Sequence, residues 1–500
     1  MKAPAARYDR WKAPADDGQL LIWPGPAELL RDAEANHHRL TSADSVLVQN
    51  VPLPEVRRRM RLWVGQDDAQ LLIAAGHQAE LKHAGVWAKN ALIAEAADKL
   101  TGRAFHFVVD TDEPKHLVLR WPGGSVPLSD DPSIGRAPWS GLVTPPTPAH
   151  LRYIEEVFTA AASRWDFQPL LPEFLAAMRQ RSLKSSNLPN ALTDALHHLD
   201  GSLGLRYDAT IVSPLYASEP YLVFAHHLLA RADRFGANYN AALQQFRHEN
   251  RIKDPGRPMP NLKLSIDSCE VPFWLDSVSS GARSRGTVVS SRGQWALRVE
   301  GGEFRFDPAD EGWTAAGRLL SWLRGQGLRL SPRALTLTAL LRLLMADQFV
   351  HGIGGAQYDQ VLDALIASQF GLEPPRFAVT TATLYFPDAL RQPRVCLPCL
   401  VQEGHRLKHG ILGPQKIQLV EQIAALPRRS PQRSALFAEM HDKLTAAWHD
   451  APIRAWEQQL RQAEAQAQEE RVLFDRELFY AIQPRERLIT LIDRYRKQLG

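Results

Sequence analysis

Cysteine is scarce in this sequence. Three cysteines among 500 residues are too few for a disulfide framework, and this scarcity predicts a reducing, cytoplasmic compartment. Cys396 and Cys399 form a C-x-x-C with His405 and His409 downstream, from which a zinc site can be drawn. The spacing after Cys399 is much shorter than in zinc fingers, so we interpret the two cysteines as ordinary thiols.

Long apolar runs and dense basic tracts are also missing. The most apolar segment, residues 334–350, contains Arg342 and Asp347 and is too short to cross a bilayer comfortably, so we predict a buried helix there. The first residues of the chain form no apolar signal segment. The formal charge of +4 comes without Lys/Arg tracts interleaved with aromatic residues. We therefore expect neither a membrane nor nucleic acid as a partner.

The composition that remains is that of a globular α/β protein. Hydrophobic residues make up 45% of the chain and charged residues 23%, and 500 residues exceed what one core usually holds. Residues 71–75 are a short apolar run, residues 84–100 have helical spacing, and "AFHFVVD" is a second apolar run. This order predicts a βαβ unit over residues 71–110, with its two strands parallel.

Other segments predict inserted regions and a helical C-terminal part. Residues 128–150 are rich in Pro, Gly and Ser and indicate a linker, residues 151–199 are helical in pattern, and residues 273–306 alternate as in a β-meander. We predict a helical hairpin over residues 417–472, because its second helix carries apolar residues spaced 3, 4, 3 and 4 apart. This seam consists of Ile453, Trp456, Leu460, Ala463 and Ala467. It favours a coiled-coil arm over a helix pair packed flat on the body.

Polar residues follow the first predicted strand. Gly76, His77 and Gln78 are expected on the turn between strand and helix, with His83 just before the helix and Asn90 further along it, next to Lys89. Ligands of open parallel sheets bind outside the carboxyl ends of the strands, and a helix N-terminus there favours anions. Imidazoles at such a place can bind a phosphate or carboxylate, or move a proton near neutral pH.

Acidic residues follow the second predicted strand. Asp110, Asp112 and Glu113 repel one another unless a cation is close by, such as Mg²⁺, a substrate amine or a basic side chain. The alternative is that they cap a helix on a solvated loop. Glu270, which precedes a Pro-Phe-Trp run, is expected to be buried with a raised pKa unless a basic residue such as Arg251 or Lys253 pairs with it.

A glycine-rich turn is the third candidate. His351 precedes Gly354, Gly355 and a predicted helix with Asp359, and backbone amides of such a turn can hold an anion. The sequence pattern places no strand before this turn, so we do not interpret it as a dinucleotide fingerprint. His351 can equally be a core histidine. A hydroxyl-rich strand follows with Thr380, Thr381 and Thr383, for which ordinary strand chemistry is the alternative.

Four blocks in this order resemble the bacillithiol biosynthesis cysteine-adding enzyme family. They are "AGHQAELKHAGVWAKN", "FHFVVDTDEPKH", "LSPRALTL" with "FVHGIGGAQYD", and "RFAVTTATLYF". The first is similar to the family's Gly-Gln-Gln turn, with His77 in place of the first Gln. The resemblance implies a Rossmann-like parallel-sheet core related to class I aminoacyl-tRNA synthetases, inserted helical and β connecting regions, and a C-terminal coiled-coil arm that forms a homodimer.

The expected domain organisation follows from this resemblance and the patterns above. It comprises residues 1–127 as the first part of the core, 128–313 as linker, helical and β-meander insertions, 314–415 as the second part of the core, 416–472 as the coiled-coil hairpin, and 473–500 as a helix returning to the core. The family joins cysteine to an amino sugar attached to malate. Carried over by position, the pocket residues are His77, Gln78, Asp110, Asp112, His351, Gly354 and Thr383.

We therefore expect a ligase-like enzyme that forms an amide between an amino acid, such as cysteine, and an amine-bearing small molecule such as an amino sugar conjugate. The expected catalytic residues are His77, Asp112 and His351. The expected binding residues are Gly76, Gln78, His83, Asn90, Asp110, Glu113, Gly354, Gly355, Asp359, Thr381 and Thr383. A free carboxylate must be activated, so a nucleotide (ATP or ADP) with Mg²⁺ is the expected cofactor.

Two alternatives stay open at this point. One is a glycosyltransferase-like enzyme that uses Asp110-x-Asp112 to hold a metal and a nucleotide sugar. The other is a catalytically degenerate relative, kept as a dimeric scaffold or ligand sensor.

Overall fold

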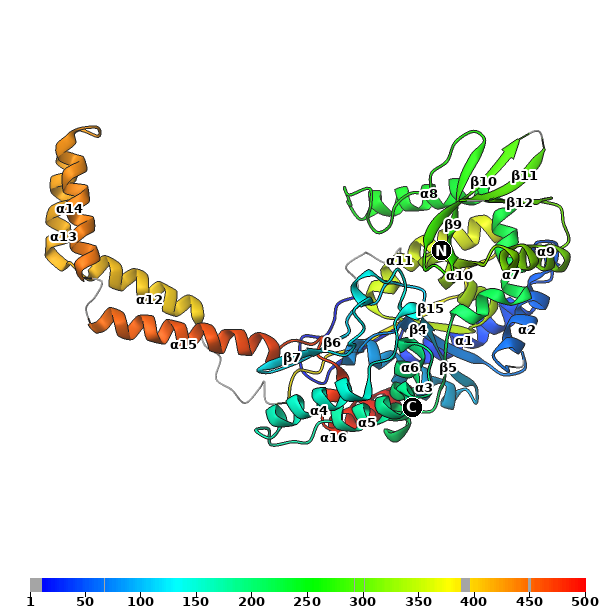
Figure 1. Ribbon diagram of the computed structural model, residues 1–500, viewed down its shortest axis with the longest axis horizontal. Coiled ribbons are helices and arrows are strands. Elements are labelled where there is room, and N and C mark those ends of the chain that lie inside the picture. The colour runs from blue at the N-terminus through cyan, green and yellow to red at the C-terminus, as the bar shows by residue number, and fades with distance from the viewer. Residues whose placement is uncertain (1–10, 67, 292, 301, 388–395, 448–450) are drawn as a thin grey trace. The chain divides into compact units, whose positions relative to one another are not determined.

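The computed structural model describes residues 11–66, 68–291, 293–300, 302–387, 396–447 and 451–500 (Figure 1). The chain is a mixed α/β protein and divides into two compact units. Unit 1 comprises Met1–Arg120, Gly124–Leu384 and Arg476–Gly500, and unit 2 comprises Trp121–Gly123 and Tyr385–Asp475. In the described ranges, no helix has both the length and the apolar character that a membrane crossing requires.

A six-stranded sheet forms the centre of unit 1. Its order is β1 (Leu20–Trp23), β15 (Phe377–Ala382), β14 (Gln348–His351), β4 (Leu72–Gln78), β5 (Arg103–Val109) and β8 (Asp208–Ile211). All neighbours are parallel except β1, which runs antiparallel to β15. The predicted βαβ unit with parallel strands is confirmed, since β4 and β5 pair in parallel from Leu72 opposite Arg103 to Gln78 opposite Val109.

The strand order reverses between β4 and β14. From β4 the sheet continues through β5 and β8 on one side, and through β14 and β15 on the other. Successive connections therefore leave in opposite directions at this point, which opens a crevice at the carboxyl ends of the two strands. Gly76–Gln78 of β4 and His351 of β14 lie at these ends.

Helix α3 (Ala84–Lys99) connects β4 to β5 and packs against β4, β5, β14 and β15. His83 caps its N-terminus, where Nδ1 accepts a hydrogen bond from the Gly85 backbone N–H at 3.1 Å. Alanines on most faces let the helix approach the sheet closely, and Leu92 and Ile93 are fully buried, each worth about 1.5–3 kcal/mol. The helix predicted over residues 84–100 is confirmed.

A second, antiparallel sheet has the order β12 (Gly302–Phe306), β11 (Gln294–Val299), β10 (Arg283–Ser291), β9 (Ser268–Ser277) and β13 (Leu328–Pro332). The predicted β-meander is confirmed, and β13 extends it by pairing Leu330 with Leu275. Both leucines are buried in the main core of the unit, which gives the added strand its apolar side.

The strongly helical pattern predicted over residues 151–199 is confirmed, because three helices form there, α4, α5 and α6. These three and the other helices of unit 1 cover the two sheets. They are α1 (Pro26–Thr41), α2 (Leu53–Trp63), α4 (Pro148–Ala162), α5 (Leu171–Ser182), α6 (Leu188–Ser202), α7 (Glu219–Leu229), α8 (Ala232–Glu249), α9 (Gly312–Gly325), α10 (Ala334–Leu344), α11 (Ile353–Phe370) and α16 (Arg485–Leu499). The described residues also form the short strands β2 (Leu47–Val48), β3 (Val51–Pro52), β6 (Val118–Trp121) and β7 (Gly124–Pro127).

The buried helix predicted over residues 334–350 is wrong at its C-terminal end. Helix α10 stops at Leu344, and Gln348–His351 form strand β14 between β4 and β15. The reason is tertiary: Asp347 accepts the Leu72 backbone N–H at 2.7 Å, which aligns the start of β14 with β4. Local helical pattern is a weak preference that such pairing overrides.

Unit 2 contains the described helices α12 (Leu397–Gly410), α13 (Gly413–Ala425), α14 (Pro431–Ala447) and α15 (Ala451–Leu473). They pack as two pairs, α12 with α15 and α13 with α14, which differs from the predicted two-helix hairpin (Figure 1). Met440 of α14 packs against Leu419 and Ile423 of α13. In the predicted seam, Ile453 and Ala463 are buried, whereas the side chain of Ala467 lies outside the described residues.

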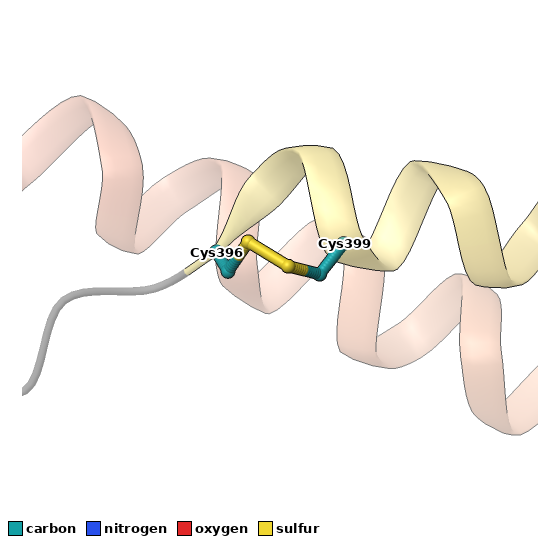
Figure 2. Close-up of a disulfide and its surroundings, with 2 residues drawn as sticks. All are labelled: Cys396 and Cys399. Atoms are coloured by element: carbon teal, nitrogen blue, oxygen red, sulfur yellow. A yellow bond between two sulfur atoms is a disulfide. The ribbon is translucent and has the colours of Figure 1, made fainter.

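Cys396 and Cys399 are joined by a disulfide, so their interpretation as ordinary thiols is wrong (Figure 2). The two residues occupy the N-cap and the first turn of α12, where their Cα atoms lie 5.2 Å apart. A helical turn brings residues three apart to one face, within the range that a disulfide spans. The described part of the chain contains no group of three or more His, Cys, Asp or Glu side chains that could hold a metal ion.

Candidate functional site

A pocket of about 450 Å³ lies at the carboxyl ends of β4, β14 and β15, at the reversal in strand order. Open α/β sheets bind their ligands at such a reversal. Of the predicted site residues, those that line the pocket are Gly76, His77, Gln78, His83, Asp112, His351, Gly354, Gly355, Asp359 and Thr381. The structure therefore brings together residues from three segments that the sequence separates widely. Leucines of α10, with Phe349 and Val86, form an apolar wall.

Gly76, His77 and Gln78 are strand residues, which corrects the prediction that they form the turn. They are the last three residues of β4 and pair in register with Phe107, Val108 and Val109 of β5. The strand extends beyond its apolar run because it pairs with β5. Polar and apolar residues can both form the backbone hydrogen bonds of this pairing. The consequence is a firm backbone beneath His77 and Gln78.

His77 contacts a buried ionisable group, and its side chain is a quarter exposed to the pocket. Nδ1 of His77 lies 3.1 Å from Oε1 of Glu80. Burial and the charges of Lys89 and Lys82 lower the pKa of His77 well below its usual range. The imidazole is therefore neutral at pH 7, so it serves as a hydrogen-bonding group or a proton acceptor and carries no fixed positive charge.

Lys89 is the most unusual side chain at this end of the sheet. It lies on α3, lines the pocket, and donates from Nζ to the carbonyl of Gly76 at 2.7 Å. Burial and repulsion by Lys82 lower the pKa of Lys89 to about 7, and burial raises the pKa of Glu80 to about 7. Groups that titrate near neutral pH and face a pocket are typical of functional sites.

The lowered pKa of Lys89 predicts a pH-dependent stability. Above pH 7 the folded protein releases this proton, whereas an unfolded lysine keeps it up to about pH 10, so the unfolding free energy rises with pH in this window. Relative to Lys89→Met, the wild-type protein should gain about 1.4 kcal/mol per pH unit above pH 7, measured by urea unfolding. Lys99→Met, on the exposed end of the same helix, is the matched control. A wild-type advantage that does not change with pH would contradict the assignment.

The acidic loop after β5 is split between two environments. Asp112 lines the pocket and accepts a hydrogen bond from Nε2 of Gln78 at 2.8 Å. Asp110 is buried and does not line the pocket: Oδ1 accepts the backbone N–H of Ser213 at 2.9 Å. Glu113 lies on the surface, 3.7 Å from Lys115. Neighbouring backbone and side-chain groups of the protein therefore supply each of these carboxylates with a hydrogen-bond or ion-pair partner.

This arrangement does not suit a Mg²⁺ ion held by the acidic loop. The Asp110 carboxylate, whose pKa burial raises although Ser213 hydrogen bonds oppose the shift, is directed to a backbone amide. Asp112 alone reaches the pocket from this loop. The two aspartates of the D-x-D sequence consequently do not face one ligand, and we derive no catalytic step through a metal.

His351 ends β14 and lines the pocket beside a buried ion pair. Its Nε2 lies 2.8 Å from Oδ2 of Asp359, and the same carboxylate oxygen accepts from Nη1 of Arg342 at 2.6 Å. Burial would raise the pKa of Asp359, but the facing side chains of His351 and Arg342, which both hydrogen-bond to the carboxylate, outweigh it and lower the pKa. An ionised carboxylate accepts the Nε2–H, which leaves the lone pair of the imidazole on Nδ1.

Because His351 ends β14, the glycine-rich turn does follow a strand, contrary to the prediction.

Gly355 leaves Nδ1 of His351 uncovered. A Cβ atom at Gly355 would lie only 2.8 Å from this nitrogen, whereas a Cβ atom at Gly354 would meet nothing within 4 Å. Both glycines lie in the first turn of α11 and both line the pocket. The steric need for glycine is therefore specific to position 355, and it concerns access to the imidazole.

The two threonines of β15, Thr380 and Thr381, and Thr383 just after it have different surroundings. Thr381 lines the pocket and accepts from Nη2 of Arg476 at 2.8 Å. Thr380 is hydrogen-bonded to the hydroxyl of Tyr495, and Thr383 donates to the carbonyl of Pro14 at 2.6 Å. Of the two threonines predicted to bind a ligand, only Thr381 therefore lies on the pocket.

Asn90 and Glu270 take structural roles. Asn90 is fully buried and donates from Nδ2 to Asp200 at 2.9 Å, outside the pocket. Glu270 is buried as expected, but its partners are Arg333 at 2.7 Å and Arg285 at 3.3 Å in place of the residues suggested by the sequence. Although burial favours a raised pKa, these arginines and the Lys263 backbone N–H lower the pKa of Glu270.

Sequence reasoning missed two residues that line the pocket and two that contact its lining residues. Lys89 was placed on the helix but not among the candidate residues, and Arg476, Glu80 and Arg342 were not connected with the site. A lysine within an otherwise alanine-rich, apolar helix is a signal that could have indicated Lys89, because a charge there must be buried. Arg476 had no such signal, since only the folded chain brings it to Thr381.

No protein-family model matches the sequence, and no curated protein matches it significantly.

Proposed function

We propose that this chain is a ligase-like enzyme that joins the carboxylate of an amino acid to the amine of a small molecule. A nucleoside triphosphate first activates the carboxylate, and the amine then displaces the leaving group, so the products are the amide, the cleaved nucleotide and its released phosphate or pyrophosphate. The observation that supports this proposal most is the His351–Asp359 pair, because both residues line a pocket at the reversal of the sheet.

His351 is the general base in this proposal. An attacking amine must lose a proton as its nitrogen bonds to the acyl carbon, and Nδ1 of His351 takes that proton. Asp359 accepts from Nε2–H, orients the ring and stabilises the imidazolium that forms, and Arg342 keeps Asp359 ionised. A general base that is oriented by a carboxylate is the part of a catalytic triad that carries out proton transfer.

The wall of the pocket formed by β4 and α3 suits a carboxylate. Gln78 is held by Asp112, and Lys89 lies beside the neutral His77, so the wall offers an amide, an amine and imidazoles. Lys89, when protonated, is an attractive partner for a carboxylate because the site is partly buried and weakly screened. The apolar wall of α10 leaves room for an uncharged substrate portion.

Activation of a free carboxylate requires an energy source, for which a nucleoside triphosphate is the chemical class we propose. When bound, it would supply a leaving group on the acyl carbon. The residues that would hold it are Lys89 and Arg476, with the imidazole of His83, whose pKa burial lowers to about 4, as a neutral hydrogen-bonding group. No step of the proposal depends on a metal ion.

The resemblance to the cysteine-adding enzyme family points to cysteine as the amino acid and an amino sugar conjugate as the amine. In the same proposal, the parallel sheet is a Rossmann-like core, and the helices of unit 2 form a coiled-coil arm for homodimer formation. The solution mass of the full chain, measured by light scattering, tests the dimer.

A two-part experiment tests the proposed function. The thermal midpoint is first measured with ATP, ADP and other nucleotides, with and without Mg²⁺, where a ligand at about 100 times its Kd should add about 2.7 kcal/mol of stability. The full chain is then incubated with the stabilising nucleotide, each amino acid and an amino sugar acceptor, and condensation products are detected by mass spectrometry. Absence of both a nucleotide shift and any amide product would overturn the proposal.

His77→Ala and Asp112→Ala distinguish an enzyme from a scaffold. Both side chains line the pocket, so an enzyme should lose product formation or substrate affinity when either is removed. A scaffold or sensor without chemistry would keep its assembly state and show no product with or without these substitutions.

A further inference from the structure

The disulfide of unit 2 lies at the exposed N-terminus of a helix. Cys396 is the N-cap of α12, and Cys399 lies in its first turn (Figure 2). Both cysteines and the intervening Pro398 are exposed to solvent. An attacking thiolate therefore reaches the sulfur atoms without any local unfolding of the helix.

A structural role explains this disulfide poorly. Its sequence separation is three, and backbone hydrogen bonds from the N–H groups of Cys399 and Leu400 to the carbonyl of Cys396, at 3.0 and 3.2 Å, already close the same turn. A crosslink stabilises a fold mainly by closing a long loop in the unfolded chain, and this loop is among the shortest possible. Helix α12 is instead fixed on α15 by Trp456, whose Nε1 donates to the carbonyl of Leu400 at 2.8 Å.

The local environment favours a thiolate. The positive end of a helix dipole stabilises negative charge on a sulfur at the N-terminus. The neighbours Leu397, Pro398 and Leu400 are uncharged, so no acidic side chain in this turn opposes that effect. A stabilised thiolate is also a better leaving group, which speeds exchange.

We infer that Cys396–Cys399 is a redox-active disulfide that exchanges with thiols of low molecular mass. The thiolate RS⁻ attacks Sγ of Cys396, a new S–S bond forms between R and Cys396, and the Cys396–Cys399 bond breaks with its electron pair leaving on Cys399. A second RS⁻ attacks the sulfur of R in this mixed disulfide and releases Cys396 as a thiolate. Two thiols are thereby oxidised to RSSR, and the protein disulfide is reduced to two thiols.

Glutathione is the probe for the test. Cys269→Ser leaves the pair as the only cysteines of the chain, and this protein is equilibrated in buffers of reduced and oxidised glutathione, alkylated, and weighed by mass spectrometry. We expect the pair to pass from fully alkylated to unlabelled within the range of these buffers. Reduction should be about tenfold faster than for the unfolded peptide Cys-Leu-Pro-Cys, which has the same atoms without the helix.

Single variants locate the attacked sulfur. In Cys399→Ser, a glutathione adduct should accumulate on Cys396, whereas Cys396→Ser should form less adduct on Cys399. Far-UV circular dichroism of each variant shows whether the helices of the full chain are kept. The inference is overturned if the pair stays oxidised in the most reducing buffer, if it never forms a disulfide, or if only a protein dithiol of the thioredoxin type reduces it.

Discussion

Replacing His351 by asparagine is expected to lower the turnover of amide formation by about 10²–10⁴-fold, because a positioned general base contributes this much to proton transfer. The KM values should change little, since in this proposal the imidazole acts on the proton in transit and the wall of β4 and α3 holds the substrates. Asp359→Asn should lower turnover as well, because Nε2–H then loses the ionised acceptor that orients the ring. Steady-state kinetics with product detection by mass spectrometry measures both effects.

Two neighbouring glycines provide a matched control for this role. Gly355→Ala places a Cβ atom 2.8 Å from Nδ1 of His351 and should impair turnover, whereas the Cβ atom of Gly354→Ala meets nothing within 4 Å. Both substitutions add the same atom to the first turn of α11 and raise helix propensity equally. A difference in turnover between them therefore reports on access to the imidazole.

Three results would contradict the assignment of the base. One is an unchanged turnover in His351→Asn with the fold intact, and another is an equal loss of turnover in Gly354→Ala and Gly355→Ala. The third is a large rise in KM with unchanged turnover, which would make His351 a binding residue. Thermal unfolding of each variant separates loss of chemistry from loss of fold.

The sequence contained enough information to locate this end of the sheet. The apolar runs before Gly76 and Asp110, with a helical pattern between them, fix a βαβ unit, and parallel strands place their carboxyl ends together. That argument correctly brought His77 and Asp112 to one pocket. It depends only on local periodicity and on the geometry of parallel strands, which a single sequence reveals well.

What the sequence did not reveal depends on contacts between distant segments. Strand β14 lies within an apolar run that is also typical of a helix. Only its pairing with β4 and β15 makes this segment a strand. Asp110 looked equivalent to Asp112, but the Ser213 backbone amide turns it away from the pocket. Arg342 has no local signal for its role with Asp359, because the ion pair forms only when α10 packs on α11.

Replacing Asp347 by asparagine is expected to destabilise unit 1 by about 3–5 kcal/mol, the range for removing one partner of a buried ion pair. Arg57 and Arg61 both donate to this carboxylate, and the side chains of all three residues are fully buried. Its Oδ2 also accepts the Leu72 backbone N–H at 2.7 Å, which joins the beginnings of β4 and β14. Asparagine keeps the shape but removes the carboxylate partner of Arg57 in the core and leaves Arg61 with Asp68 alone, 3.2 Å from its Nε.

Urea unfolding followed by far-UV circular dichroism measures this effect, with Asp44→Asn on an exposed site as the control. Arg57→Met combined with Asp347→Asn should cost less than the sum of the single changes, because Arg57→Met removes the charge that Asp347→Asn leaves without a carboxylate partner. Strictly additive losses, or a loss no larger than that of the control, would contradict the role of Asp347.

The difference in unfolding free energy between wild type and Asp347→Asn should also depend on pH, which provides an independent test. Burial opposes ionisation of Asp347, but the charge of Arg57, the hydrogen bond from His37 and the charge of Arg61 together lower its pKa below that of an unfolded aspartate. A lowered pKa in the folded state means that the unfolded chain takes up the proton first as the pH falls. The advantage of wild type over Asp347→Asn should therefore be complete above the pKa of an unfolded aspartate, about 3.9, and disappear as the pH falls through the folded value. An advantage that persists unchanged in acid would show that packing of this side chain, and not its charge, stabilises the join between β4 and β14.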